Sequence, residues 1–351
     1  MSTFRCEVVQ VEAIETIEGA DRLELAVVGE YRSVVGKGQY QQGDLIAFIP
    51  ENSVVPDAIL EELNLVDKLG GSRKNRVKAR KFLGYLSEGL VYPDKGWNLG
   101  DDVTEILGVR KYDPTESLPA TMRGRTKKVG PILPYAFKYD IEDFKKYNQI
   151  FQEGDQVVAT EKIHGSCMIA GYIPDINTQF VGSKGQFAQG ITIDIEAEEN
   201  VRNLWVYCFE KYCLGPKLRK LSEKYPGEVV YILGEAFGNQ DLKYGMTQGD
   251  YGFRAFDIRV GKRYVDSDVF AALCVELDLE TAPVLYSGPF DKELIFRIAS
   301  GTETVSNTSQ IREGIVIRPV KEAWNNRFGR VILKLRSDEY MTRKGNATEF
   351  E

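Results

Sequence analysis

The first hundred residues show short runs of apolar and β-forming positions separated by polar turns. Cys6–Ile17 is rich in β-formers, and Arg22–Val28 and Tyr31–Val35 flank Gly29-Glu30, which predicts a hairpin. Asp44–Pro50 is a further short strand that ends at a proline. Short strands at this spacing, joined by Gly-containing turns, predict a small β-barrel.

Apolar residues recur at helical spacing in three segments. Pro56–Val66 predicts a helix inside the barrel region, and Asp140–Ile150 predicts one with Phe144 and Tyr147 on the same side. Ile195–Lys224 is predicted to be mostly helical. Its regularly spaced apolar residues are assigned to the hydrophobic core: Val201, Leu204, Trp205, Cys208 and Phe209.

Five apolar strands in the second half each carry charge at one end or on one face. Their charged residues are Lys162, Glu235, Asp257, Glu313, Lys334 and Arg336. Charged groups are rarely buried unless they are paired, hydrogen-bonded or bound to metal. If these strands converge, they predict a central pocket that holds lysines, carboxylates and a metal ion. Lys334 and Arg336 lie two apart and should share one face, with Leu333 and Leu335 on the packed face.

Residues 113–135 are rich in proline and glycine and show no apolar period, which indicates a boundary. A length of 351 residues fits two domains. We therefore expect domains at residues 1–112 and 136–351, joined by a linker at 113–135. The linker is basic and could be a plain connection or could help to hold a nucleic-acid strand; its cations are Arg123, Arg125, Lys127 and Lys128.

The amino-acid composition indicates which classes of protein and which kinds of site the chain can form. The chain is 43% hydrophobic and 28% charged, as expected for a globular protein with a sizeable core. Its net charge of −7 means that any nucleic-acid contact must come from local basic patches. Five scattered cysteines and a single histidine argue against a disulfide framework and a structural zinc site. With no signal peptide or membrane span in the sequence, we expect an intracellular protein, cytoplasmic or nuclear.

One local basic patch is strong. Six of the nine residues from 73 to 81 are cationic, namely Arg73, Lys74, Arg76, Lys78, Arg80 and Lys81. Alone, such a run is best interpreted as a solvated loop. On a small barrel it gains weight as a nucleic-acid-binding surface, because cationic loops there track phosphates.

The most informative stretch is Glu161-Lys162-Ile163-His164-Gly165-Ser166, which lies between two predicted strands. Taken alone, Lys162 in this corner is best interpreted as a solvated turn lysine. The alternative is a nucleophilic amine, and the other motifs of the chain favour it.

Two resemblances follow from these motifs. The N-terminal hundred residues resemble an OB-fold of the tRNA-binding kind, through Ile17–Glu24, Val34–Gly38 and Arg76–Leu90. Residues 135–345 resemble the covalent nucleotidyltransferases, which include polynucleotide ligases and mRNA capping enzymes. The matching motifs, in order, are Lys162–Ser166, Val181–Gly185, Leu233–Gly238, Phe253–Asp257, Glu313–Arg318 and Leu333–Arg336. The histidine in the first motif, the leading OB module and the tail Ser337–Met341 are similar to those of RNA ligases with an N-terminal OB domain.

The resemblance implies a mixed α+β fold in which antiparallel sheets form a nucleotide cleft, preceded by the barrel. It implies an ATP-dependent RNA ligase that acts on RNA or RNA-containing duplexes with 3′-OH and 5′-phosphate ends, as a monomer without membrane contact. Lys162 would form a lysyl-AMP phosphoramide with ATP, since nearby cations favour a neutral amine. Lys334 and Arg336 would join Lys162 as catalytic residues, and Glu313 with Glu235 would hold Mg²⁺ or Mn²⁺.

The resemblance also implies a nucleotide-binding set. Phe253 would stack on adenine, Glu235 would bind ribose hydroxyls and Lys184 would contact phosphate. The remaining residues of the set are Glu161, Ile163, Gly165, Glu313 and Arg318.

One departure and two alternatives stay open. Arg336 stands where the family usually has a second lysine; arginine keeps the charge but is not isosteric. A GTP-dependent capping enzyme would share the covalent lysine. A non-catalytic RNA-binding protein would carry damaged motifs, whereas every candidate ionisable position here is filled.

Overall fold

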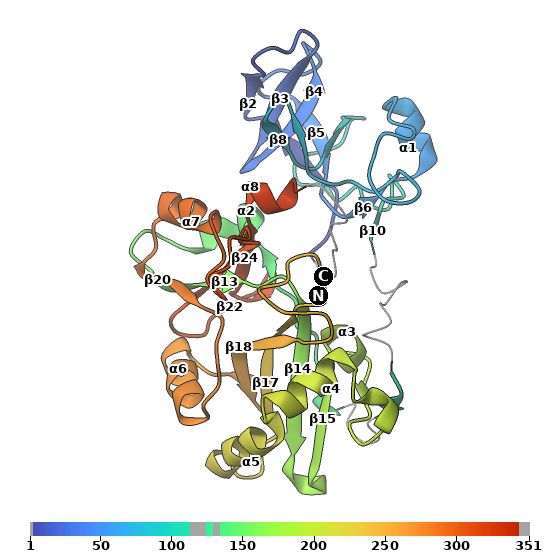
Figure 1. Cartoon of the computed structure of the whole chain (residues 1–351). Coiled ribbons are helices and arrows are strands. Elements are labelled where there is room, and N and C mark those ends of the chain that lie inside the picture. The colour runs from blue at the N-terminus through green and yellow to red at the C-terminus, as the bar shows by residue number, and fades with distance from the viewer. Residues whose placement is uncertain (1–2, 113–123, 129–133, 344–351) are drawn as a thin grey trace. The chain divides into compact units, whose positions relative to one another are not determined.

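The computed structural model describes residues 3–112, 124–128 and 134–343 (Figure 1). The chain divides into two compact units, residues 1–113 and 114–351. Each unit has its own hydrophobic core. Within the described ranges, no helix has the length and apolar character that crossing a membrane requires.

The N-terminal unit is a small antiparallel barrel. Its strands are β1 (Glu7–Gln10), β2 (Ala13–Thr16), β3 (Leu23–Val28), β4 (Tyr31–Gly36), β5 (Leu45–Ile49) and β9 (Leu90–Pro93). They form the ladders β2-β3-β4 and β1-β5-β9, and β4 also contacts β9. Val28 lies opposite Tyr31, which confirms the predicted hairpin at Gly29-Glu30. Val8, Ile46 and Ala47 are among the fully buried core residues.

A long connection between β5 and β9 carries the basic run. It contains β6 (Ser53–Val54), α1 (Asp57–Glu62), β7 (Arg80–Phe82) and β8 (Tyr85–Ser87), and β6 pairs with β10 (Arg110–Lys111). The helix is shorter than predicted. It ends at Glu62 because Asn64 turns into the left-handed region at φ 55°.

The C-terminal unit contains a seven-stranded sheet in the order β11-β16-β15-β14-β17-β18-β19. The strands are β11 (Thr126–Lys128), β14 (Ser166–Ile173), β15 (Thr178–Ser183), β16 (Ile191–Ile193), β17 (Val230–Phe237), β18 (Gly252–Val260) and β19 (Arg263–Tyr264). One face is covered by α4 (Leu204–Lys211), α5 (Leu214–Lys224) and α6 (Ser267–Glu276) (Figure 1). The short helix α3 (Lys184–Phe187) follows β15.

A five-stranded sheet in the order β12-β24-β21-β13-β20 completes this unit. The strands are β12 (Glu142–Asp143), β13 (Gln156–Lys162), β20 (Val284–Pro289), β21 (Gly314–Pro319) and β24 (Leu333–Arg336). Helices α2 (Phe144–Tyr147) and α7 (Lys292–Ala299) pack on one face, β22 (Trp324–Asn325) and β23 (Gly329–Arg330) form a small hairpin, and α8 (Asp338–Met341) follows β24.

Several predictions of elements need correction. Asp140–Ile150 is a short strand, a one-turn helix and a 3₁₀ turn, although Phe144 and Tyr147 are buried together as expected. Ile195–Lys224 contains two helices, because Cys213 takes a left-handed conformation at φ 51°. Val201 lies outside them and is 65% exposed, so its assignment to the core is wrong.

The predicted linker lies largely outside the described residues. Its described part includes β11, which adds a strand to the seven-stranded sheet by pairing with β16. Arg123 falls outside the described residues. Arg125 donates its backbone N–H to Asn200, so this stretch of the predicted linker is attached to the second unit.

The chain passes from one sheet to the other at the Lys162 motif. β13 ends at Lys162 in the five-stranded sheet, and β14 begins at Ser166 in the seven-stranded sheet. The two strands predicted on either side of this corner are confirmed, but they do not pair with each other. The corner therefore belongs to both halves of the second unit.

Candidate active site

Lys162 is paired with a buried carboxylate. Its Nζ donates to Glu313 Oε1 at 2.6 Å, and the Lys162 side chain is 19% exposed whereas that of Glu313 is 2% exposed. Burial alone would raise the pKa of Glu313, but Lys162 and His164 outweigh burial and lower it. The pairing therefore favours the carboxylate form of Glu313, and an amine acts as a nucleophile only in its unprotonated form.

The strand register places the predicted cations on the face that carries Lys162. Lys162 lies opposite Gly314 on β21, and Gly314 lies opposite Arg336 on β24. Lys334 is two residues before Arg336 on the same strand, so all three side chains share a face. Leu333 and Leu335 are buried in the opposite core, as the sequence predicts. With one strand between them, the backbones of Lys162 and Arg336 are about 10 Å apart.

The seven-stranded sheet contributes Glu235 from β17. Burial raises the pKa of Glu235 to about 8, Lys162 opposes the rise, and Glu313 adds to it. The charge of Lys184 also acts on Glu235, which places the predicted phosphate ligand near the same group. Two carboxylates from different sheets therefore lie close to the amine, and Glu235 is protonated at neutral pH.

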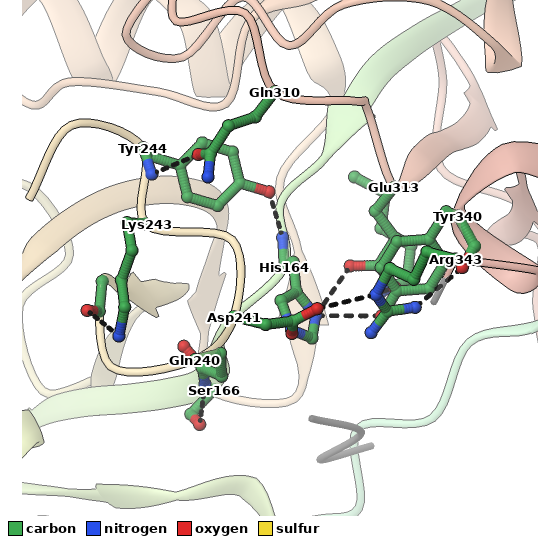
Figure 2. Close-up of polar contacts among 12 residues, drawn as sticks. His164, Ser166, Gln240, Asp241, Lys243, Tyr244, Gln310, Glu313, Tyr340 and Arg343 are labelled. Carbon is green, nitrogen blue, oxygen red and sulfur yellow. Dashed lines mark hydrogen bonds and ion pairs between the residues drawn. The ribbon is translucent and has the colours of Figure 1, made fainter. Parts of the chain in front are cut away.

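His164 connects this centre to the end of the described chain (Figure 2). Its Nε2 lies 2.7 Å from Asp241 Oδ1, while its Nδ1 lies 2.9 Å from the Tyr340 hydroxyl and 3.5 Å from Glu313 Oε2. Arg343 Nε donates to Asp241 Oδ2 at 2.8 Å. Burial alone would lower the pKa of His164, but Asp241 and Glu313 outweigh burial and raise it. The raised pKa favours the protonated form of His164, which lies between the carboxylates of Asp241 and Glu313.

Gly165 allows the corner to approach the neighbouring strand. A Cβ on Gly165 would lie 2.4 Å from the Ala236 carbonyl oxygen and 2.8 Å from Glu235 Cγ. No larger residue fits without a backbone shift. Gly165 therefore brings the Lys162 corner against the strand that carries Glu235.

The neighbours of Lys162 have structural partners. The Glu161 carboxylate accepts from the backbone N–H and the hydroxyl of Thr304 at 2.8 and 2.7 Å. Ile163 is buried in a core cluster with Tyr244. These placements do not test the predicted nucleotide contacts of Glu161 and Ile163, but they show that both side chains hold the corner in place.

Arg318 joins the two sheets. Asp257 on β18 is completely buried, and it accepts from Arg318 at 2.8 Å, from Arg330 at 2.6 and 2.9 Å, and from the Tyr139 hydroxyl at 2.8 Å. The pKa of Asp257 would be raised by burial, but the two guanidinium groups lower it below its usual value. Arg318 is therefore paired with Asp257, and its predicted contact with the nucleotide stays a prediction.

Phe253 does not lie in the pocket. It is 1% exposed and packs in the core beneath α4 and α5, against Gly234 and Tyr212. A bulge between Leu233 and Gly234 leaves the half-buried Phe256 beside core residues of the pocket side, including Ile163. Phe256 lies three residues after Phe253, so the alternation of side chains along β18 places the two rings on opposite faces of the sheet. The prediction that Phe253 stacks on adenine is therefore wrong.

The basic run divides into exposed and buried members. Arg73, Lys74, Arg80 and Lys81 are exposed, and Lys78 is half-buried. Arg76 is 9% exposed, bonds to Asn52 Oδ1 and stacks over the Tyr112 ring at 3.8 Å. Arg76 therefore has structural partners within the barrel unit, and its predicted contact with nucleic acid stays a prediction.

The donor groups limit which metal sites are feasible. Among residues 3–112, 124–128 and 134–343, no group of three or more His, Cys, Asp or Glu side chains is placed to hold a metal ion. Glu313 Oε2 is buried and, within the same described ranges, accepts no hydrogen bond. With Glu235 nearby, this oxygen fits an ion such as Mg²⁺ or Mn²⁺ that takes most of its ligands from phosphate and water.

Sequence reasoning missed Asp241, Tyr340 and Arg343 as members of the site. Asp241 lies 77 positions after His164, and Tyr340 lies 176 positions after it, so no local sequence pattern relates the three residues. The only signal was the tail Ser337–Met341, whose likeness to RNA ligases was noted without a role for its tyrosine.

Comparisons with known proteins agree with this architecture. The family model described as RNA ligase matches residues 155–336, and a model of an OB-fold domain matches residues 6–94. Among solved structures, an apo variant of Naegleria gruberi RNA ligase has a TM-score of 0.78 at 21% identity, covering 97% of this chain and 98% of that one. A lysine-to-alanine variant of Naegleria gruberi RNA ligase with ATP and Mn has a TM-score of 0.77 at 22% identity, with 96% and 98% covered. No curated protein sequence gives a significant match. The mixed α+β fold with a leading OB-fold barrel is confirmed.

Proposed function

The chain belongs to the RNA ligase family, and from that premise we propose that it is an ATP-dependent ligase that acts through a lysyl-AMP intermediate. The proposed substrates are RNA ends with a 3′-hydroxyl and a 5′-phosphate, at nicks in duplex RNA or RNA–DNA hybrids. The observation that carries the proposal is Lys162, held 2.6 Å from Glu313 on the sheet face that also carries Lys334 and Arg336.

In the first step the neutral amine of Lys162 attacks the α-phosphorus of ATP. The new P–N bond replaces the bond to pyrophosphate, which leaves with its electron pair, and the nitrogen releases one proton to solvent as the phosphoramide forms. Because the pKa of Glu313 is low, this carboxylate stabilises the ammonium form and holds the amine in place before reaction. Lys334 and Arg336 favour the neutral amine by repulsion and would stabilise charge on the phosphate in the transition state.

Mg²⁺ or Mn²⁺ would be held by Glu313 and Glu235 together with phosphate oxygens. When bound, the ion supplies positive charge against the phosphates. The buried Glu313 Oε2, without a hydrogen-bond partner among the described residues, supports this assignment. Ionisation of Glu235, whose pKa is raised to about 8, should accompany metal binding and release a proton.

The adenosine would be recognised from the seven-stranded sheet. We assign the aromatic contact with adenine to Phe256, which stacks on Tyr139 at 5.5 Å between ring centroids and packs beside Ile163. Glu235 remains the candidate for the ribose hydroxyls and Lys184 the candidate for phosphate.

The later steps transfer AMP and join the ends. The RNA 5′-phosphate attacks the phosphoramide, the P–N bond breaks, and Lys162 regains its amine. The 3′-hydroxyl then attacks the activated 5′-phosphate, a phosphodiester forms and AMP leaves. The exposed cations Arg73, Lys74, Arg80 and Lys81 would hold the nucleic acid through its phosphates.

The test is incubation of the protein with a divalent metal and α-labelled ATP or α-labelled GTP, followed by a denaturing gel. We expect acid-labile label from ATP that is lost in Lys162→Ala. Label from GTP would assign the protein to the capping enzymes. No label from either nucleotide, in a folded protein, would leave only a binding function. Sealing of a nicked RNA duplex, compared with a nicked DNA duplex and single-stranded RNA, then tests the substrate.

A further inference from the structure

The β7–β8 hairpin in the barrel unit has an unusual tip. β7 and β8 pair with Phe82 opposite Tyr85, which leaves Leu83-Gly84 as a two-residue turn. Both residues have positive φ, 49° for Leu83 and 91° for Gly84. Turns of this kind strongly favour Asn-Gly or Gly-Gly, because side chains crowd the backbone in the left-handed region.

Packing within the barrel unit does not explain why a leucine, rather than glycine or asparagine, occupies this turn position. Leu83 is 63% exposed, so its side chain buries little surface in exchange for the backbone strain. A strained residue persists when the surrounding structure holds it, and such residues concentrate at functional sites. An exposed apolar side chain at a strained turn is therefore a candidate contact for a ligand.

The base of the hairpin is firmly held. Glu88 donates its backbone N–H to the Arg32 carbonyl oxygen at 2.7 Å, and the Ser87 hydroxyl accepts from the Val34 backbone N–H at 2.9 Å. A Cβ on Gly89 would lie 2.4 Å from the Phe48 ring, so the chain leaves the hairpin in tight contact with the barrel. The tip is therefore presented on a fixed support.

The charges beside the tip indicate the class of ligand. Arg80 and Lys81 on β7 are exposed, although the whole chain carries a net charge of −7. Cations directly beside an exposed apolar tip match a nucleic acid, in which phosphates flank an apolar base face. Apolar side chains that wedge against bases are used in this way by other nucleic-acid-binding proteins. The hairpin also lies in the connection between β5 and β9, the last two barrel strands, and OB-folds can bind oligonucleotides through the loop at this place.

We propose that the β7–β8 hairpin is an RNA-binding element in which Leu83 packs against the face of an unstacked base and Arg80 and Lys81 contact the neighbouring phosphates. The inference rests on the proposed function for its choice of RNA. The proposal adds an apolar contact with a base to a surface whose cations alone would bind only the phosphates. The leucine contributes affinity that salt does not screen, and the two cations contribute the part that salt weakens.

The test measures binding of the full-length protein to a fluorescent nicked RNA duplex, without divalent metal so that no sealing occurs. Leu83→Gly and Leu83→Asn both suit the turn better than leucine, so their thermal unfolding midpoints should match or exceed that of the wild type. We expect both variants to raise the Kd about tenfold, as for one lost leucine contact. Their slope of log K against log salt should be unchanged, whereas Lys81→Ala should reduce the slope by about 0.9.

Matched controls separate this inference from a general surface effect. Leu99 is 64% exposed and lies outside the basic run, so Leu99→Ala should leave the Kd unchanged. A Kd within about twofold of the wild type for both Leu83 variants would overturn the inference. Label transfer from ATP needs no RNA, so failure of the proposed function would appear in that assay, while failure of the hairpin proposal would appear only in the Kd.

Discussion

Two carboxylates between the same pair of sheets have opposite surroundings. Asp257 accepts four hydrogen bonds, from Arg318, Arg330 and Tyr139, and both of its oxygens are satisfied. Glu313 has one oxygen on Lys162 and a second, buried oxygen whose contact with His164 Nδ1, at 3.5 Å, is too long to count among the hydrogen bonds of the described residues. Both oxygens of Asp257 therefore have hydrogen-bond donors, whereas Glu313 can still accept a further hydrogen bond or bind a metal ion.

This difference distinguishes a buried carboxylate that stabilises the fold from one that can bind a ligand or take part in a reaction. Completed networks in a low-dielectric interior fix a structure, and incomplete ones are costly unless a ligand completes them. Sequence shows only that both residues are acids near the ends of apolar strands. The partners of each oxygen distinguish the roles, and the following predictions test that distinction.

Removal of the nucleophile should have the largest effect on activity. Lys162→Ala should reduce label transfer from ATP by more than about 1,000-fold, because no other amine takes its place. The free energy of unfolding should fall by only about 1–2 kcal/mol, since Glu313 keeps His164 and can take up a proton. Gel assay and urea unfolding measure the two quantities. Retained label transfer would remove Lys162 from the mechanism.

Removal of Asp257 should have the largest effect on stability. Asp257→Ala leaves two guanidinium groups buried without their common partner, so we expect a loss of about 3–5 kcal/mol in urea unfolding. The exposed Asp175→Ala serves as a control with no expected effect. A loss below about 1 kcal/mol for Asp257→Ala would contradict its structural role.

Glu235 should make the protein less stable as pH rises. Its folded pKa of about 8 lies above the ordinary value, so the folded state keeps a proton that the unfolded state releases. Stability should therefore fall between about pH 4.5 and pH 8 through this group. The change in the free energy of unfolding caused by Glu235→Gln should be more favourable at pH 8 than at pH 5 by about 1–3 kcal/mol, as urea unfolding would measure. The variant should also lose label transfer. Equal effects at both pH values would contradict the raised pKa.

His164 also has a raised pKa in the folded state, but here the favoured form is the charged imidazolium, whereas for Glu235 it is the neutral acid. Its contribution to stability is fully present below about pH 6.5 and is lost as pH rises through the folded pKa. His164→Asn should therefore destabilise the protein by about 1 kcal/mol more at pH 6 than at pH 9. Urea unfolding at the two pH values gives the difference. A larger loss at pH 9 would mean that the neutral imidazole is the stabilised form.

Arg336→Lys should have the smallest effect. It restores the usual family residue, keeps the charge and removes only the forked donor geometry. We expect label transfer within about tenfold of the wild type, whereas Arg336→Ala should lose more because the charge is absent. If both variants behave alike, the charge of Arg336 does not act on the phosphate.

The ordered motifs predicted most of this site because strand periodicity constrains them. Lys334 and Arg336 share the face of Lys162, and Leu333 and Leu335 face the core, as alternation requires. Phe253 was chosen by its place in the motif, whereas the structure buries it in the core beneath α4 and α5. Phe256, three residues further along the strand, lies on the opposite face. Arg76 was assigned from the basic run and Arg318 from the motif Glu313–Arg318. Neither pattern reveals the partners Asn52 and Asp257, which are distant in sequence.

The contact between His164 and α8 has a consequence for how the protein is made. Tyr340 is synthesised 176 residues after His164, and Arg343 later still. At about 5–20 residues per second, roughly 10–35 seconds of translation separate the two sides of this contact. A ribosome-bound chain therefore carries its nucleophile before the histidine beside it is anchored. Helix α8 is synthesised after the other described elements of the centre, so a nascent chain that lacks α8 would hold Lys162 and His164 in an unfinished site.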